Sequence, residues 1–127
     1  MAVTVEHITF DADDAARLAR FWAAVLQREV DPDASREFAT IGRAAQVAAD
    51  AGALQPVWMF IRVPEPRVGK NRIHVDLASP DRRADVERAL AAGATHVADL
   101  AEFGTAWTTL RDVEGNVFDI GDGPAGA

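Results

Sequence analysis

Two stretches of the chain alternate apolar and polar residues, and each is followed by a stretch with the spacing of an amphipathic helix. Residues 3–10 (VTVEHITF) and 72–77 (RIHVDL) have the period of two that is typical of a half-buried strand. Residues 11–27 then place apolar side chains at helical spacing, while residues 79–93 begin with Ser-Pro and end with Gly. We expect Asp11 or Asp13 to cap the first helix and Ser79 to cap the second.

The two halves read as copies of one unit. A shift of 67 residues superposes His7 on His74 and Asp14 on Asp81. Three strand-like runs follow each helix, at 37–42, 44–50 and 56–63 and then at 95–101, 105–111 and 116–120. The run at 44–50 is rich in alanine and also fits a helix by propensity. Residues 112–116 (DVEGN) fit the turn between the last two strands.

The pattern as a whole predicts an α+β fold built from tandem βαβββ units. Repeat one is expected at 1–66 and repeat two at 67–122, within a single domain over 1–122 that is followed by a flexible tail at 123–127. Half of the residues are hydrophobic (49%), which is enough apolar material for the core of a chain of 127 residues.

Composition excludes several kinds of function. A net charge of -7 without a basic stripe argues against nucleic acid as a partner. The chain has no cysteine, which leaves only His, Asp and Glu as strong metal ligands. Neither an apolar leader nor an apolar run near the roughly 20 residues of a membrane span is present. We therefore expect a cytoplasmic protein with no membrane partner.

Alternation along the strands assigns side chains to faces. In the fifth strand, the positions expected to pack on the helix are Ile73, Val75 and Leu77. The opposite positions are Arg72, His74 and Asp76. By the same rule His7 in the first strand and Asp119 in the last strand face the side of His74. Two histidines and a carboxylate are thus predicted on one face.

These features resemble the vicinal oxygen chelate superfamily, which includes glyoxalase I, bleomycin-resistance proteins and extradiol dioxygenases. The resemblance rests on the tandem unit, on the histidine in the first strand of each copy, and on the stretches KNRIHVDL (70–77) and RDVEGNVFDI (111–120). It covers nearly the whole chain and is nearest to the small glyoxalase-like domains. It implies a curved mixed sheet that forms a cup.

The resemblance also implies a set of metal ligands. Metal-dependent members take ligands from the first, fourth, fifth and eighth strands, which here correspond to His7, Ile61, His74 and Asp119. Because isoleucine cannot bind a cation, three ligands remain, and such a set leaves coordination positions open for a substrate oxygen. The implied cofactor is one divalent metal ion (Fe, Mn, Ni or Zn), or none if the cup binds its ligand without metal.

Further candidates for substrate binding share the predicted cup face: Arg72, Asp76, Trp107, Thr109 and Ile61. For Arg72 and Asp76 the alternative is a salt bridge, and for Trp107 it is a place in the core. Lys70, the only lysine, and Asn71 fit either loop-fixing residues or the mouth of the pocket. His96 is expected at the surface. No residue is assigned as a catalytic general base.

Two functions remain open at this stage. One is a metalloenzyme of lyase or dioxygenase type acting on a substrate with vicinal oxygens. The other is a metal-free protein of the bleomycin-resistance type that binds or sequesters a small molecule. In either case we expect a homodimer, because each half-open sheet leaves an edge strand and an apolar surface to cover.

Overall fold

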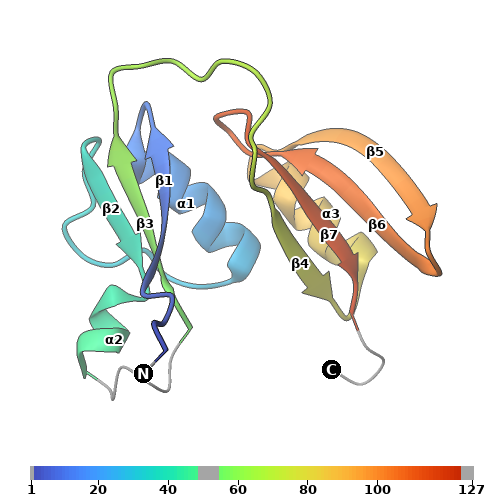
Figure 1. The fold of residues 1–127 in the computed structure, drawn as a ribbon, viewed down its shortest axis with the longest axis horizontal. Coiled ribbons are helices and arrows are strands. Elements are labelled where there is room, and N and C mark those ends of the chain that lie inside the picture. Colours follow the sequence, from blue (N-terminus) through green and yellow to red (C-terminus); the bar gives the residue numbers. More distant parts are fainter. Residues whose placement is uncertain (1, 49–54, 124–127) are drawn as a thin grey trace. The chain divides into compact units, whose positions relative to one another are not determined.

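The computed structural model describes residues 2–48 and 55–123, and the chain divides into two compact units, Met1–Pro66 and Arg67–Ala127 (Figure 1). Each unit combines a mixed sheet with helices, so the predicted α+β fold class is confirmed. The single domain over 1–122 stays a prediction. None of the helices in the described part has the length and apolarity needed to cross a membrane.

The first unit contains three strands and two helices. In chain order these are β1 (His7–Ala12), α1 (Ala15–Leu26), β2 (Phe38–Ile41), α2 (Arg43–Ala48) and β3 (Val57–Arg62). Strand β3 lies in the centre of the sheet, parallel to β1 and antiparallel to β2.

The strand predicted at 44–50 is wrong over 44–48, which are helical, while residues 49 and 50 lie outside the described part. Alanine favours the helix there. In addition, Val30 pairs with Ile41 in an isolated antiparallel bridge, so a residue preceding β2 occupies the edge that a further strand would need. The first unit is therefore βαβαβ and the tandem βαβββ prediction holds only for the second.

An aromatic cluster forms the core of the first unit. The ring of Phe10 in β1 lies 5.6 Å from Trp22 of α1 and stacks on Trp58 and Phe60 of β3, at 5.6 and 5.2 Å. Trp22 and Phe60 are almost completely buried. Burying side chains of this size contributes about 1.5–3 kcal/mol each. Trp58 and Phe60 thus face the helix layer, where Trp58 lies 5.1 Å from Trp22.

The second unit is a four-stranded sheet with one helix. Its elements are β4 (Val75–Ser79), α3 (Arg82–Ala91), β5 (Thr95–Glu102), β6 (Thr105–Arg111) and β7 (Val117–Asp122). The strand order is β4-β7-β6-β5, with β4 parallel to β7 and the other pairs antiparallel. The predicted βαβββ topology is confirmed for this unit.

The turn between β6 and β7 forms where DVEGN predicted it. The buried Asp112 carboxylate accepts hydrogen bonds from the backbone N–H groups of Glu114 (2.9 Å) and Asn116 (3.0 Å). Gly115 has φ +89°, a conformation that glycine adopts without steric cost.

Helix starts differ from the predicted capping residues. Asp14 caps α1 by accepting from the Arg17 N–H, and Asp81 caps α3 by accepting from the Ala84 N–H. Asp11, Asp13 and Ser79 were therefore wrong as caps, although the 67-residue shift had paired the two true caps. Ser79 instead donates to Asp85. Burial raises the pKa of the Asp85 carboxyl, but hydrogen bonds from Ser79 and Arg88 outweigh this and leave it below its ordinary value.

Strand β4 begins at Val75, three residues later than predicted. Ile73, expected in the core, has 84% of its surface exposed, whereas Val75 and Leu77 alternate with exposed neighbours as predicted. The preceding segment is held by a side chain in place of a backbone ladder. Asn71 accepts from the Val117 N–H at 3.1 Å and donates to the Ile73 carbonyl at 2.6 Å.

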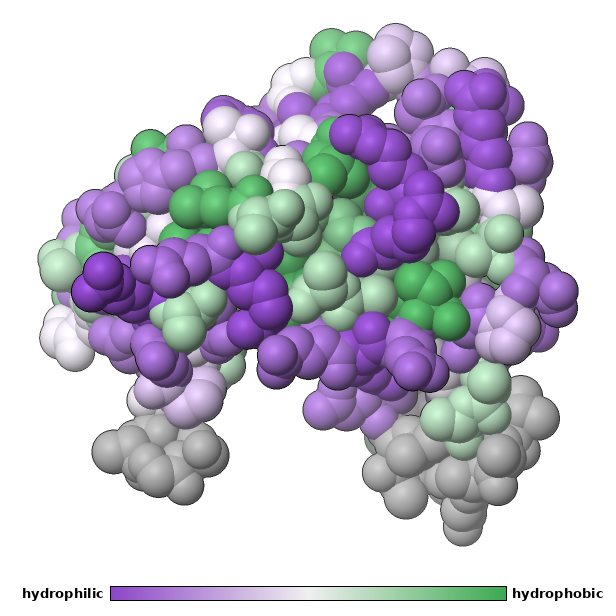
Figure 2. Space-filling model, turned by 180° about the vertical axis from the view of Figure 1, so that it is seen from behind, coloured by the Kyte–Doolittle hydropathy of each residue, from purple (hydrophilic) through white to green (hydrophobic). Residues whose placement is uncertain are grey.

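The helix side of the second unit is more polar than that of the first. Only Ala89 of α3 is fully buried. Arg82 of α3 donates to Thr108 at 2.9 Å, and Thr108, which is 2% exposed, donates to Asp99 at 2.7 Å. Figure 2, which shows the chain from the side opposite to Figure 1, has many hydrophilic residues and also a group of hydrophobic residues near the middle of the view.

Candidate functional site

Three polar side chains lie next to one another across adjacent strands of the second unit. Asp76 of β4 is the register partner of Asp119 in β7, which in turn is paired with Thr109 in β6. The residues that flank Asp119 in β7, Phe118 and Ile120, are buried in the core. Alternation therefore turns the three polar side chains to the opposite face, as the sequence predicted for Asp119 and Thr109.

Short polar contacts join this row to His74. The Nδ1 atom of His74 lies 2.8 Å from Oδ1 of Asp76 and 3.8 Å from Oδ2 of Asp119. Thr109 donates its hydroxyl to the other oxygen of Asp119 at 2.5 Å. The Asp119 side chain is only 19% exposed, whereas that of Asp76 is 69% exposed. The donor atoms of His74, Asp76 and Asp119 all lie within 4.8 Å of one another.

This donor set suits a divalent cation. The imidazole of His74 and the carboxylate of Asp119 offer a nitrogen and an oxygen ligand, a combination that Mn(II), Fe(II) and Zn(II) accept, and Asp76 can support the imidazole. A hydrogen bond from Nδ1–H to Asp76 fixes the tautomer that leaves Nε2 of His74 free to bind a metal, an arrangement common around metal-binding histidines. The residues present therefore fit a metal ion.

His7, the third predicted ligand, lies at the start of β1 in the first unit. Its side chain is 33% exposed and lies 4.0 Å from the carboxylate of Glu6. Alternation along β1 puts it on the face opposite Ile8 and Phe10, as expected. Its role as a ligand together with His74 and Asp119 stays a prediction.

Ile61 does not occupy the position equivalent to Asp119. In the first unit Ile61 is paired with Asp11, four residues beyond His7 along β1, which amounts to about 13 Å. The β1–β3 register pairs Thr9 with Met59, as the β4–β7 register pairs Asp76 with Asp119. Met59 is thus the symmetric counterpart of Asp119, and the expected equivalence of Ile61 was wrong. A methionine thioether is a poor ligand for hard divalent ions, so the first unit still lacks a carboxylate at this place.

Of the other residues predicted to bind substrate, three lie on the face of the polar row and one, Arg72, lies in the segment before β4. Asp76 and Thr109 belong to the polar row already described. Trp107 lies two residues before Thr109 in β6 and shares its face. Arg72 lies in the segment before β4, and within the described part it forms no ion pair with Asp76, which contacts His74 instead. His96 is exposed and pairs with Asp99 at 3.2 Å, in agreement with the expected surface position.

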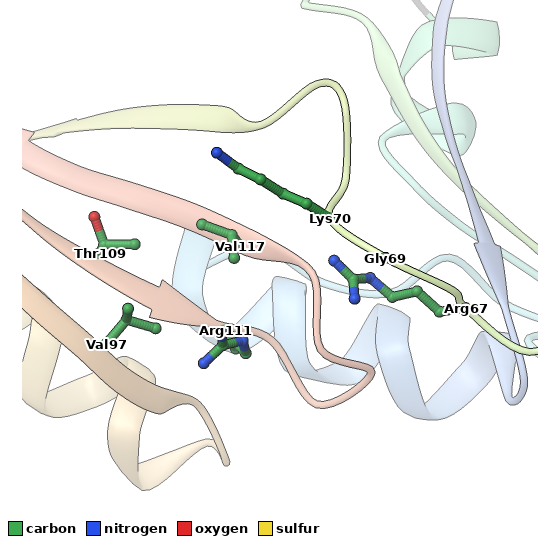
Figure 3. Close-up of a pocket in the computed structure, with 7 residues that line it drawn as sticks. All are labelled: Arg67, Gly69, Lys70, Val97, Thr109, Arg111 and Val117. Carbon is green, nitrogen blue, oxygen red and sulfur yellow. The ribbon is translucent and has the colours of Figure 1, made fainter.

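A hollow of about 460 Å³ adjoins the polar row (Figure 3). Its lining residues are Arg67, Gly69, Lys70, Val97, Thr109, Arg111 and Val117. Thr109 thus lines the hollow and also donates a hydrogen bond to Asp119, which forms a cluster with His74 and Asp76 (the His74 cluster). Apart from Thr109 and Lys70, these residues were not singled out by the sequence. Lys70 could be noticed because it is the only lysine, but Arg67 and Arg111 are two of twelve arginines and carry no signal of their own.

Comparison with solved structures places the fold among glyoxalase-related proteins. A glyoxalase/bleomycin resistance protein/dioxygenase family enzyme from Burkholderia phytofirmans matches with a TM-score of 0.72 at 19% identity, covering 94% of this chain and 98% of that one. A mutant of the fosfomycin resistance protein FosX from Listeria monocytogenes, complexed with Mn(II) and a dihydroxypropylphosphonic acid, gives 0.72 at 13% identity, with 98% and 93% covered. An oxidase gives 0.61 at 18% identity, with 100% and 98% covered.

Sequence comparison assigns the family directly. No protein of curated function matches the sequence. The family model of the glyoxalase-like domain, in contrast, matches residues 7–121, which include His7, His74 and Asp119. The resemblance inferred from KNRIHVDL and RDVEGNVFDI is confirmed, and the chain belongs to the glyoxalase-like domain family.

Proposed function

We propose that this protein is a metal-dependent enzyme that acts on a small substrate with vicinal oxygen atoms, by lyase or dioxygenase chemistry. The observation that carries the proposal is the cluster of His74, Asp76 and Asp119, whose donor atoms lie within 4.8 Å of one another on the open face of the second sheet. His74 and Asp119 are the proposed ligands in this unit, and His7 is the further ligand that the sequence predicts.

A bound divalent ion would supply a Lewis acid that polarises neighbouring substrate oxygens. The chain's own residues prepare this role. Thr109 holds one oxygen of Asp119 by its hydroxyl and leaves the other oxygen free as a ligand. Asp76 orients the imidazole of His74 through Nδ1. Such contacts to the ligands commonly change metal affinity by 10–100-fold.

The solved FosX mutant complex supports the proposal by analogy. That protein is complexed with Mn(II) and a dihydroxypropylphosphonic acid, which carries oxygen atoms for a metal. At 13% identity the similarity concerns the fold, so the choice of metal and of substrate for this chain depends on its own side chains.

A metal-free binding protein is the second candidate, and the hollow beside Thr109 favours it. A concave surface with two valines and three cationic side chains is suited to hold a small molecule without any metal. Binding of divalent ions separates the two functions.

The test is a titration of the chelator-treated full chain with Mn(II), Fe(II) under anaerobic conditions, Ni(II) and Zn(II), followed by calorimetry and elemental analysis. Wild type should bind one ion per chain. His74→Ala and Asp119→Ala should weaken binding at least tenfold, whereas His96→Ala should not, because His96 pairs with Asp99 away from the cluster.

His7→Ala tests the third predicted ligand in the same titration, and it should also weaken binding. If wild type binds none of the four ions near one equivalent, the metalloenzyme proposal fails and the binding protein remains. Equal losses in His74→Ala and His96→Ala would also contradict it, since they would indicate adventitious binding to surface histidines.

A further inference from the structure

Three cationic side chains surround the hollow beside the polar row. Arg67 and Lys70 come from the segment before β4, and Arg111 comes from the end of β6 (Figure 3). They are three of only 13 basic residues in a chain of net charge -7. Cations brought to one concavity of an acidic protein repel one another unless an anion lies between them.

None of the three takes part in an ion pair within the residues that the structure describes. Arg67 donates to the side-chain oxygen of Asn71 at 3.2 Å. This acceptor is neutral, and the bond uses only one of the five N–H groups of Arg67. Lys70 and Arg111 make no hydrogen bond to a described side chain. The three arginines of α3, in contrast, are in ion pairs: Arg82 with Asp122, Arg83 with Glu87 and Arg88 with Asp85. The cations at the hollow are therefore available to a ligand.

The walls between the cations are apolar. Val97 of β5 and Val117 of β7 line the hollow, and Gly69, with φ +76°, leaves the space in front of its Cα open. A ligand that fills this hollow needs an anionic group near the cations and an apolar portion against the valines.

The loop before β4, which carries Arg67 and Lys70, is anchored to the sheet. Asn71, next to Lys70, accepts from the Val117 N–H at 3.1 Å and so ties the loop to β7. The aliphatic part of Arg67 lies beside the β6–β7 turn, since a Cβ built on Gly115 would lie 4.0 Å from its Cδ atom. The Asn71 bond therefore ties the loop to β7, the strand that carries Asp119.

From this arrangement we infer that the substrate or ligand carries an anionic group, a carboxylate, phosphonate or phosphate, which Lys70, Arg111 and Arg67 bind beside the His74 cluster. The inference rests on the proposed function, because it names the substrate class of the site whose metal ligands are His74 and Asp119. Arginine and lysine bind such oxyanions through charge-assisted hydrogen bonds.

Asp119 brings a negative charge close to the hollow. Asp119 is hydrogen-bonded to Thr109, which lines the hollow, and its charge opposes an incoming anion. A cation bound by Asp119 would cancel this repulsion. Divalent ion and anion should therefore bind with positive coupling, each raising the affinity of the other by the same factor.

The test uses benzoate as the probe and benzyl alcohol as its neutral counterpart of similar shape. Both are titrated by NMR into the chelator-treated full chain at low salt, so that the result does not depend on the metal. Benzoate should bind at least tenfold more tightly than benzyl alcohol, and its affinity should fall as salt is added. Lys70→Gln and Arg111→Gln should each weaken benzoate binding about tenfold.

Arg83→Gln is the matched control, because Arg83 is an exposed arginine of α3 that pairs with Glu87 and does not line the hollow. It should leave benzoate affinity unchanged. Equal binding of benzoate and benzyl alcohol, or an equal loss in Arg83→Gln, overturns the inference. Charge-dependent benzoate binding without any binding of divalent ions supports the anion site and overturns the metalloenzyme proposal, so the two can fail separately.

Discussion

Replacement of Asn71 by alanine should destabilise the protein because one side chain joins the loop before β4 to the β7 strand. Its Oδ1 accepts from the Val117 N–H at 3.1 Å, and its Nδ2 donates to the Ile73 carbonyl at 2.6 Å. Two further contacts are weaker, a 3.4 Å approach of Nδ2 to the Val117 carbonyl and the exposed 3.2 Å bond from Arg67.

The expected loss follows from the two short bonds. A hydrogen bond in a folded protein contributes about 1 kcal/mol net, and alanine leaves the partly buried Val117 N–H without an acceptor. We expect the free energy of unfolding to fall by about 2 kcal/mol. For a chain of this size that corresponds to a drop of about 6 to 12 °C in Tm.

Urea and thermal denaturation followed by circular dichroism measure this loss, and hydrogen exchange of the Val117 amide shows whether it is local. Lys70→Ala is the control, since the exposed Lys70 side chain makes no hydrogen bond to the strands within the described residues, and an exposed substitution changes stability by less than about 0.5 kcal/mol. A change below about 0.5 kcal/mol in Asn71→Ala, or an equal loss in Lys70→Ala, would refute the role given to Asn71.

Three other changes test the ligand cluster, the polar helix side and the aromatic core. Thr109→Val removes the donor to Asp119 with little change of shape, and calorimetry should show that the affinity for the divalent ion falls about 10-fold. The lowered pKa of Asp85 means that its ionised form adds stability above about pH 4 and that this is lost at lower pH, so the loss in Asp85→Asn measured in urea should shrink from neutral pH to about pH 3. Trp22→Ala should cost about 3–5 kcal/mol in the same assay.

Features that depend on period and symmetry could be predicted from the sequence. The alternation of Phe118, Asp119 and Ile120 fixes which side chains reach the core, and the structure agrees. The 67-residue shift paired Asp14 with Asp81, and both cap helices. The cap itself was placed wrongly because several polar residues precede each helix, and only backbone geometry decides which one accepts the hydrogen bond.

Register and strand ends could not be predicted in this way. Alternation does not distinguish Met59 from Ile61, since both face the same side of β3, and only the pairing with β1 decides between them. The start of β4 was missed for a related reason. Asn71 satisfies backbone groups of Val117 and Ile73, so the alternating pattern continues where the strand does not.

In each unit the first strand pairs in parallel with the last, β1 with β3 and β4 with β7, but the units differ in what covers their sheets. This difference explains where the candidate chemistry lies. In the first unit Trp22 and Phe60 close an apolar core, and the position equivalent to Asp119 is Met59. In the second unit α3 is largely charged, and Thr109 places a hydroxyl beside Asp119. Because a carboxylate at low exposure needs hydrogen-bond donors in place of water, Asp119 is tolerated where such a neighbour exists. A carboxylate at Met59 would lack an equivalent donor from the register partner Thr40, whose hydroxyl already binds Asp31, so the asymmetry of ligands follows from the asymmetry of hydrogen bonding.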